Sequence, residues 1–399
     1  RDLGAEGGAF ALDAACASTL YALAIACRKL QMRKLDLAVV GAVNATDNLN
    51  LHRGFAALQA LSPTGRSRPF MDGADGLVPA EGAAAVVLKR AGDIAPDETV
   101  FAIIRGLGLS NDGRRRGFVA PDEDGQFEAM ARAYAGCDVK PAEISALECH
   151  ATGTAIGDAV EIASSARTFA GHDGLAIGSL KSNTGHLITV AGLASLLKII
   201  GGFEHGLRPP TRIEGEHHPA LEGTPLHLQS DPDPWPGDGP RYAAISNFGF
   251  GGNNAHMVLE APEPGRAHRV TSTPAAPVAD DPIVICGLAM MAGNDLTADR
   301  VVRRAMSPPS RRMGECTSLK ADPRFARTPP ADLERTEPVQ LAMLSLGEAA
   351  MADVAPVAPE RAGVLVAMGC AADSTRMVLQ ERLAARLCLP ASDPDVQAA

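Results

Sequence analysis

Apolar residues along the first 260 positions follow two patterns, short continuous runs and runs with helical spacing. In segment 17–32 apolar side chains return every three or four residues, as on the buried face of a helix. Short apolar runs bounded by glycine or polar residues predict buried strands. The strands expected are 10–13, 37–43, 83–88, 100–105, 243–246 and 256–260, and the helices are 17–32, 126–135, 158–168 and 188–203. Strands that alternate with helices predict an α/β fold.

The pattern changes between about 261 and 281, where Pro, Ala, Thr and charged residues predominate. That composition predicts a linker with little capacity to form a core. Beyond it we expect a strand at 282–289, a helix at 338–352 and a strand at 363–369. The predicted domains are therefore residues 1–260, a linker at 261–281 and a second unit at 282–399.

Composition narrows the function classes. A chain of 399 residues, 46% of them hydrophobic, can form two or more domains with sizeable cores. The net charge of -10 argues against nucleic acid as a partner, although a local basic patch can still dock an acidic protein. No apolar run of membrane-spanning length and no secretory signal are recognised. The eight cysteines lack metal-ligand spacing, which favours free thiols and predicts a cytoplasmic location.

Cys16 lies where a predicted strand runs directly into a predicted helix. The small residues Ala14, Ala15 and Ala17 around it permit a sharp turn and leave the sulfur accessible. A thiol at a helix N-terminus is expected to have a lowered pKa and to act as a nucleophile. For this residue taken alone, a buried structural cysteine is an equally weighted alternative.

Two histidines, His150 and His186, occur among Gly and Thr residues, each interpreted as ending a strand. As neutral imidazoles, both can donate a hydrogen bond to a thioester carbonyl. Thr152 and Thr154 are candidates for binding a pantetheine arm, although turn formation also explains them.

Two further features are candidates for supporting roles. Lys181 and Glu161 can form a buried ion pair beneath the histidines, although a surface lysine and a glutamate on a helix face are the simpler interpretation. The glycine-rich turn 249–252 exposes backbone N–H groups, and the Phe250 N–H can join that of Cys16 in an oxyanion hole. A simple hairpin is the alternative for the turn, which lacks the spacing of a dinucleotide site.

Together these segments resemble the C-terminal half and active site of the β-ketoacyl synthases (ketosynthases), the condensing enzymes of fatty acid and polyketide synthesis. The matching segments are 13–18, 69–82, 150–161, 181–186 and 247–256, in family order. The run 104–113 is most similar to synthases of large multidomain assemblies, including polyunsaturated fatty acid synthases.

The resemblance implies a thiolase-like α/β fold, with mixed sheets layered with helices, and an acyltransferase activity. It implies that Cys16 holds an acyl chain while His150 and His186 assist decarboxylation of malonyl-carrier protein and stabilise the enolate. Phe250 would act as a gate beside the cysteine. The resemblance implies no cofactor and no metal.

The resemblance also implies partners. Acyl carrier protein is expected to bind, with Arg66, Arg68 and residues 114–116 as candidate basic contacts. A homodimer, or a pseudo-dimer with a ketosynthase-like domain, is expected, without nucleic acid. The first domain is expected to lack its N-terminal half, and residues from 282 resemble the start of a second ketosynthase-like domain, such as a chain-length factor.

Three alternatives remain open from the sequence. The first is a non-decarboxylating thiolase or a primer-loading synthase, against which the paired histidines argue. The second is a non-catalytic scaffold that only dimerises or binds carrier protein. The third concerns the fold: residues 282–399 can pack onto residues 1–260 and complete one composite domain.

Overall fold

A computed structural model describes residues 3, 5–45, 49–95, 98–113, 120–212, 214–237, 239–262, 283–291, 338–352, 354–355 and 362–368. Its strands are β1 (Ala9–Leu12), β2 (Leu37–Asn44), β3 (Gly82–Arg90), β4 (Ala102–Asn111), β5 (Ile144–Glu148), β6 (Leu175–Gly178), β7 (Leu207–Arg208), β8 (Leu226–Leu228), β9 (Asp233–Pro234), β10 (Tyr242–Gly249), β11 (Asn253–Glu260), β12 (Ile283–Met291) and β13 (Ala362–Met368). Its α-helices are α1 (Ser18–Gln31), α2 (Leu49–Ala57), α3 (Glu123–Ala135), α4 (Ala155–Thr168), α5 (Lys181–Thr184), α6 (Ala191–His205) and α10 (Pro338–Met351). Short 3-10 turns flank several of them, including η1 (Ala15–Ala17) and η4 (Ile188–Val190).

The strands and helices expected from the apolar pattern are present, with shifted ends. The largest shift is in β4, which was expected to end at residue 105 and continues to Asn111. Gly106 and Gly108 interrupt the apolar run there, because α3 lies against the strand and a Cβ at Gly108 would sit 2.1 Å from the carbonyl oxygen of Ala129. α2, β6 and β8 were not predicted, and β5 was expected only as the strand that ends at His150.

Eleven strands form one hydrogen-bonded sheet in the order β1-β13-β2-β3-β12-β4-β11-β10-β5-β6-β8. The sheet contains two halves that meet where β12 pairs with β4. Both halves mix parallel and antiparallel pairs: β1 pairs with β13 in parallel and β2 with β3 in antiparallel orientation. In the other half β10 runs parallel to β5 and antiparallel to β11.

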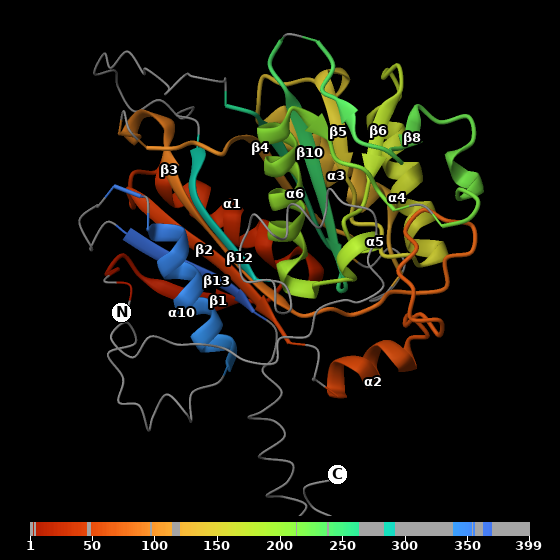
Figure 1. The fold of residues 1–399 in the computed structure, drawn as a ribbon, viewed down its shortest axis with the longest axis horizontal. Helices are drawn as coiled ribbons and strands as arrows, with labels where there is room; N and C mark the ends of the chain where they lie inside the picture. The colour runs from red at the N-terminus through yellow and green to blue at the C-terminus, as the bar shows by residue number, and fades with distance from the viewer. Residues whose placement is uncertain are drawn as a thin grey trace, which may run out of the picture.

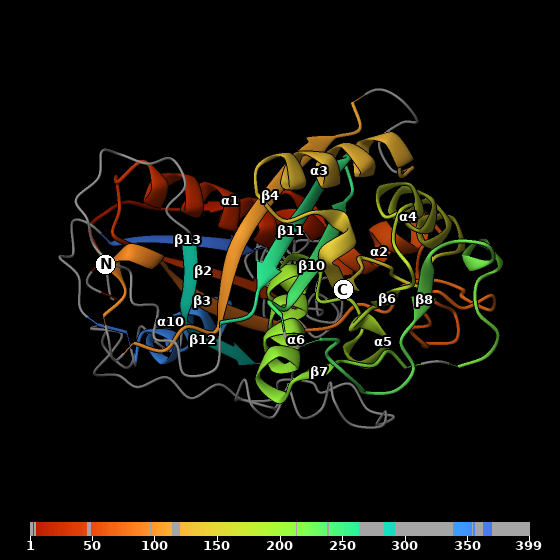
Figure 2. The same ribbon diagram turned by 90° about the horizontal axis from the view of Figure 1, so that it is seen from above.

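Helices cover both faces of each half, which makes the strands apolar on both sides. Figure 2 shows α1 and α10 on opposite sides of β2 and β3, and α3 and α6 on opposite sides of β10 and β11. Successive side chains of a strand point to opposite faces of the sheet. In β2, Val39 therefore packs in the apolar cluster with α10, whereas Val40 packs in the cluster with α1 and α6. α1 also contacts α6, so these two helices form a central layer between the halves of a thiolase-like fold.

Residues after the predicted linker complete the first half of the sheet. β13 lies between β1 and β2, and β12 lies between β3 and β4, as Figure 1 shows. α10 packs on these strands, and the Cβ position at Gly287 is only 2.0 Å from the Ala350 carbonyl oxygen. The structure thus shows the composite arrangement that the sequence left open. The boundaries of the three predicted units stay a prediction, because residues 263–282 lie outside the described part.

One segment of the described chain, Ile188–His205, is long and apolar enough to cross a membrane by length and composition. In the structure it contains η4 and α6, and 89% of it is buried inside the protein. Its apolar character is explained by its place in the central layer.

Candidate active site

The turn that holds Cys16 is fixed by local hydrogen bonds between β1 and α1. The Asp13 carboxylate accepts the Ala15 N–H at 2.8 Å, and the Ser18 hydroxyl accepts the Ala14 N–H at 2.8 Å while donating to the Ala15 carbonyl at 2.6 Å. These bonds hold Ala15 at a φ of 52°, a left-handed conformation that a residue with a Cβ rarely adopts. The sharp turn that results directs the Cys16 side chain into the interior, where only 4% of the residue is exposed.

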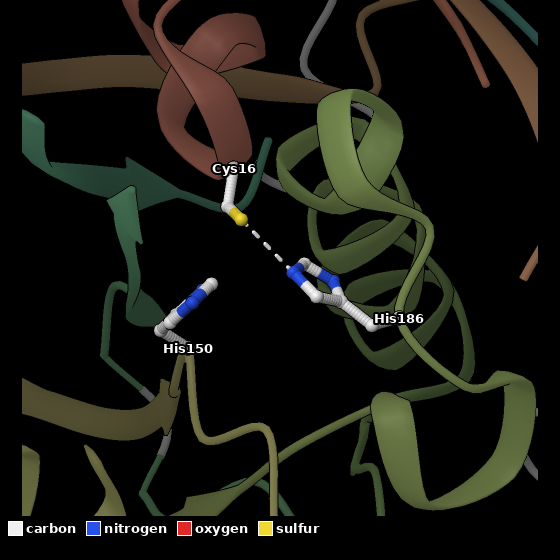
Figure 3. A group of neighbouring side chains, drawn as sticks. All are labelled: Cys16, His150 and His186. Carbon is white, nitrogen blue, oxygen red and sulfur yellow. Dashed lines mark hydrogen bonds between the residues drawn. The ribbon is translucent and has the colours of Figure 1, made fainter. Parts of the chain in front are cut away.

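His186 approaches Cys16 from the segment that precedes α6. Its Nε2 lies 3.0 Å from the Cys16 Sγ, as Figure 3 shows. The Ile188 backbone N–H donates to the other ring nitrogen, Nδ1, at 3.3 Å. A backbone N–H can only donate, so neutral His186 carries its proton on Nε2 and donates it towards the sulfur. The expectation that this histidine ends a strand is wrong, because it follows the short helix α5 and Gly185.

His150 stands at the end of β5, two residues after its last strand position. Its ring centroid is 5.4 Å from that of His186, and Figure 3 shows both rings beside Cys16. The Glu161 carboxylate anchors the backbone here, since its two oxygens accept the N–H groups of His150 and Ala151 at 2.7 and 2.6 Å. A glutamate of α4 therefore sets the position of a histidine that follows a strand of the sheet.

A second buried carboxylate, Asp158, organises the loop after His150. It accepts the N–H groups of Thr152, Gly153 and Phe70 at 3.1, 3.2 and 2.8 Å. Burial raises the pKa of Asp158 to about 6, while these three donors lower it. Asp158 belongs to a recognised motif, but no role was predicted for it, because only the fold brings Phe70 next to the loop.

Burial dominates the ionisation of Cys16. It raises the pKa of this thiol to about 11, against the opposing effects of the Lys181 charge and of the Phe250 and Cys16 backbone N–H groups. The lowered pKa expected from the position before a helix is therefore wrong for the protein as it stands. The helix N-terminus offers partial positive charge, but the loss of water around a buried sulfur is the larger effect.

The two histidines are neutral, as the sequence predicted. Burial lowers the pKa of both rings well below the usual value, and the positive charge of Lys181 lowers it further. The direct ion pair expected between Lys181 and Glu161 is absent from the contacts of the described residues. Instead Glu161 binds backbone N–H groups, and Lys181 acts on it through its charge at longer range.

The structure also contains a buried ion pair near the two histidines, and this pair was not predicted from the sequence. The Lys198 ammonium of α6 is 2.7 Å from the Glu148 carboxylate at the end of β5, and each side chain is 1% exposed. Glu148 also accepts the Leu180 N–H at 2.6 Å. The pair thus connects β5, which leads to His150, with the segment that leads to His186. A lysine inside an otherwise apolar helix was the signal that could have revealed it.

The glycine turn between β10 and β11 lies directly against the Cys16 turn. A Cβ at Gly249 would sit 2.6 Å from the Ala14 carbonyl oxygen and 3.2 Å from the Cys16 nitrogen, so only glycine fits. The Phe250 backbone N–H lowers the pKa of the Cys16 thiol. The Cys16 N–H lowers the same pKa, so the backbone N–H groups of Phe250 and Cys16 are the candidates for an oxyanion hole beside the sulfur.

Cys16, His150 and His186 open into a cavity of about 520 Å³. Thr152 and Thr154 line it, and their hydroxyl groups are 3.2 Å apart. An apolar cluster surrounds the sulfur on the inner side, made of Cys16 with Phe55, Leu77 and Ile188 and, partly buried, Leu51, Ala60, Leu61 and Phe250. The cavity therefore offers polar side chains along one wall and apolar surface next to the thiol.

The sulfur and one ring nitrogen of each histidine lie within 4.8 Å of one another, a spacing that also suits a metal ion. A histidine that binds a metal usually donates its other ring N–H to a neighbour. At His186 the opposite holds, because Nδ1 accepts the Ile188 N–H and Nε2 keeps its proton. The hydrogen bonding therefore favours a donor to a carbonyl oxygen over a metal ligand.

The raised pKa predicts a steep pH dependence of Cys16 alkylation. Iodoacetamide reacts with the thiolate, so the rate at Cys16 should rise about tenfold per pH unit between pH 7 and 10 without a plateau. Intact mass measures the rate, and Cys16→Ala gives the background from other cysteines. Lys181→Met should slow the reaction at each pH, because a charge that lowers the thiol pKa is lost. A plateau below pH 8 would contradict the dominance of burial.

Family models match most of the described chain. The N-terminal domain of β-ketoacyl synthase matches residues 1–93, the C-terminal domain of β-ketoacyl synthase matches residues 101–213, and the ketoacyl-synthetase C-terminal extension matches residues 216–298. The chain belongs to the β-ketoacyl synthase family. In this ketosynthase, Cys16 falls within the N-terminal match, whereas His150 and His186 fall within the C-terminal match.

Curated relatives of the ketosynthase are components of polyketide synthases. One phenolphthiocerol/phthiocerol polyketide synthase protein of Mycobacterium tuberculosis is 39% identical over 263 residues, which are 65% of this chain and 17% of that protein. Another protein of the same synthase, from the same organism, is 39% identical over 267 residues, 65% of this chain and 15% of that protein. The ketosynthase thus spans less than a fifth of the length of these relatives.

Solved ketosynthase structures agree with the fold. The ketosynthase from module 6 of the bacillaene synthase of Bacillus subtilis 168 superposes with a TM-score of 0.62 at 34% identity, covering 64% of this chain and 46% of that chain. The oxazolomycin ketosynthase domain of Streptomyces albus JA3453 gives 0.61 at 38% identity, covering 64% and 48%. The PfaC keto synthase–chain length factor gives 0.60 at 39% identity, covering 63% and 28%.

Proposed function

We propose that this ketosynthase joins an acyl thioester to a malonyl thioester by decarboxylative Claisen condensation in polyketide or fatty acid synthesis. The observation that supports it is the 3.0 Å contact between Cys16 Sγ and His186 Nε2, with His150 beside them and the glycine turn packed against the Cys16 backbone. These are a nucleophile, two hydrogen-bond donors and an oxyanion site around one cavity.

In the first half-reaction the Cys16 sulfur attacks the carbonyl carbon of an acyl thioester. A new S–C bond forms, the C–S bond to the carrier breaks, and the Cys16 proton leaves with the carrier thiol. The oxyanion of the tetrahedral intermediate lies at the Phe250 and Cys16 N–H groups. The apolar cluster around the sulfur suits an apolar acyl chain.

In the second half-reaction a malonyl thioester loses CO2. The electron pair of the broken C–C bond passes into an enolate whose oxygen accepts hydrogen bonds from the neutral rings of His150 and His186. The enolate carbon then attacks the acyl group on Cys16, the S–C bond breaks, and the Cys16 thiolate that leaves takes a proton from solvent. The product is a β-ketoacyl thioester on the carrier, and holding both thioesters in one cavity supplies part of the acceleration.

Replacement of His150 by alanine should separate the two half-reactions. We expect acylation of Cys16 to persist, because His186 and the oxyanion hole remain, while CO2 release from a malonyl thioester falls by roughly 100-fold. Intact-protein mass after exposure to an acyl-carrier thioester measures the first step, and CO2 release measures the second. Cys16→Ala must abolish the acyl adduct. A folded wild-type chain that forms no adduct would favour the scaffold role.

Ketosynthases of polyketide synthases act with acyl carrier protein, and we propose such a carrier as the partner of this cavity. Two exposed apolar residues line it, Ile156 at 73% and Leu58 at 46% exposure. Of the predicted basic contacts, Arg68 binds Asp75 at 3.0 Å, whereas the Arg66 side chain is 66% exposed and 3.9 Å from Glu214. Arg66 is therefore the more accessible of the two, and residues 114–116 lie outside the described part.

We also propose that the ketosynthase dimerises through β1. Among the described strands this one lies at the end of the sheet, and it has the apolar sequence Ala-Phe-Ala-Leu and exposes its first three residues. An exposed apolar edge strand is a pairing site for a second chain. Phe10→Asp should convert a dimer to a monomer in analytical ultracentrifugation, whereas the matched change Met32→Asp, at an exposed residue after α1, should not. Equal sedimentation of both variants and the wild type as dimers would refute the use of this edge.

A further inference from the structure

Asn247 is a buried polar residue that neither half-reaction uses. It lies in β10, two residues before Gly249, and is 0% exposed. Its side-chain Nδ2 is 3.4 Å from Nδ1 of His150. Buried side-chain amides are usually hydrogen-bonded, because burial of a polar group without a partner costs free energy of folding. The contact to His150 is therefore a candidate for a functional hydrogen bond.

The other end of the amide determines its orientation. Asn247 Oδ1 has no hydrogen-bond partner among the described residues and lies against the first turn of α6, where a Cβ at Gly192 would be 3.0 Å from it. The N-terminus of a helix is the positive end of its macrodipole and attracts oxygen rather than an amide NH2 group. This places the oxygen towards α6 and leaves the NH2 group facing His150.

We propose that Asn247 is a positioning residue that fixes the tautomer of His150. Its NH2 group donates to His150 Nδ1, so the proton of the neutral ring resides on Nε2, the nitrogen that is then free to donate to the enolate oxygen. The Ile188 N–H does the same for His186. A side-chain amide at one histidine and a backbone N–H at the other thus produce two matching donors. This inference rests on the function proposed above and names the group that prepares its second half-reaction.

The charged groups around His150 do not supply this control. Lys181 acts on the ring by its charge, and Glu161 accepts the backbone N–H of His150 rather than a proton of the ring. His186 faces the ring edge-on, with an angle of 79° between the two planes. Among the described residues, the Asn247 amide is the hydrogen-bond partner of His150 Nδ1.

Substitution by aspartate tests the proposal, because Asp has the shape of Asn but no donor. In full-length Asn247→Asp, His150 Nδ1 must carry the proton to bind the carboxylate, and Nε2 becomes an acceptor. At pH 8 we expect CO2 release from a malonyl thioester to fall roughly 100-fold, while Cys16 acylation stays within about threefold of wild type. Asn247→Leu, which also lacks the donor, should lower CO2 release in the same selective way.

The spectroscopic readout is the ring nitrogen resonances of 15N-histidine-labelled protein. Wild type should show His150 protonated on Nε2, and Asn247→Asp should show it protonated on Nδ1, with His186 unchanged. Ser246→Ala is the matched control, since Ser246 is the buried neighbour in β10 and bonds to His256 rather than to His150. It should keep the wild-type tautomer and both half-reactions.

Three results would overturn the proposal: unchanged CO2 release in both Asn247 variants, an unchanged His150 tautomer in Asn247→Asp, or equal loss of both half-reactions in these variants and in Ser246→Ala. Failure of the proposed function is distinct from these. In that case wild type itself would release no CO2 and form no acyl adduct, and the tautomer measurement would still decide whether Asn247 controls His150.

Discussion

Gly249→Ala should reduce acylation of Cys16 by roughly 100-fold, the usual effect of losing one oxyanion donor. The added methyl group would lie 2.6 Å from the Ala14 carbonyl oxygen and 3.2 Å from the Cys16 nitrogen, distances at which backbone must move. The turn carrying the Phe250 N–H would shift away from the sulfur. The rate of adduct formation by mass spectrometry is the measurement.

Gly171→Ala is the matched control for this change. Nothing lies within 4 Å of a Cβ at Gly171, and the residue is far from Cys16 in the sequence. It should acylate at the wild-type rate, and both variants should keep the circular dichroism spectrum of the wild type. Equal acylation rates in the two variants would show that the contact between the glycine turn and the Cys16 turn has no role in the transfer.

A chain ending at residue 262 should lose its cooperative thermal unfolding transition. This truncation removes β12 and β13, and it leaves β3 and β4 without a partner along one edge. It also removes Ile283, Val284 and Ile285, which are at most 2% exposed. Each such side chain contributes about 1.5–3 kcal/mol, while a whole domain is stable by only about 5–15 kcal/mol. The melting transition followed by circular dichroism is the measurement.

Adding residues 282–399 as a separate chain tests whether the lost stability comes from the pairing of β12 and β13 rather than from non-specific unfolding. Residues 282–399 co-expressed with residues 1–262 should restore the transition and purify as a complex, because β12 and β13 pair with strands of the other piece. A second variant, Ile285→Asp in the full chain, should also be destabilised, since this β12 residue is 0% exposed in the core cluster that contains α1 and α6. A truncated chain that melts cooperatively at the wild-type temperature would show that residues 1–260 fold alone.

Much of the fold follows from local pattern. The apolar runs of β2 and β3 and the helical spacing of α1 were readable because both faces of the strands and one face of the helix are buried. β4 was predicted too short, because glycines required by the approach of α3 break its apolar run. α2 was not recognised, because it spans only nine residues and contains Gly54.

The residues of the candidate site were predicted from the sequence, but their pKa values and hydrogen-bond partners were not. Cys16, His150 and His186 were selected from the small residues, Gly and Thr around them, and the structure brings them together. The pKa of Cys16 was predicted to be lowered and is raised. The position before a helix can be recognised from neighbouring residues, whereas burial depends on segments that are distant in the sequence. Glu161 was expected to pair with Lys181 and binds backbone N–H groups instead.

The sequence by itself determined that the chain is an α/β ketosynthase. Its short motifs and its periodic apolar residues are formed by residues close together in the chain, so they can be recognised without the structure. The tertiary structure alone decided which groups surround those residues. It shows that β12 and β13 complete the sheet, that Asn247 contacts His150, and that Cys16 is a buried thiol. These properties depend on contacts between residues about 100 to more than 300 positions apart, where water is excluded and hydrogen-bond partners are assigned.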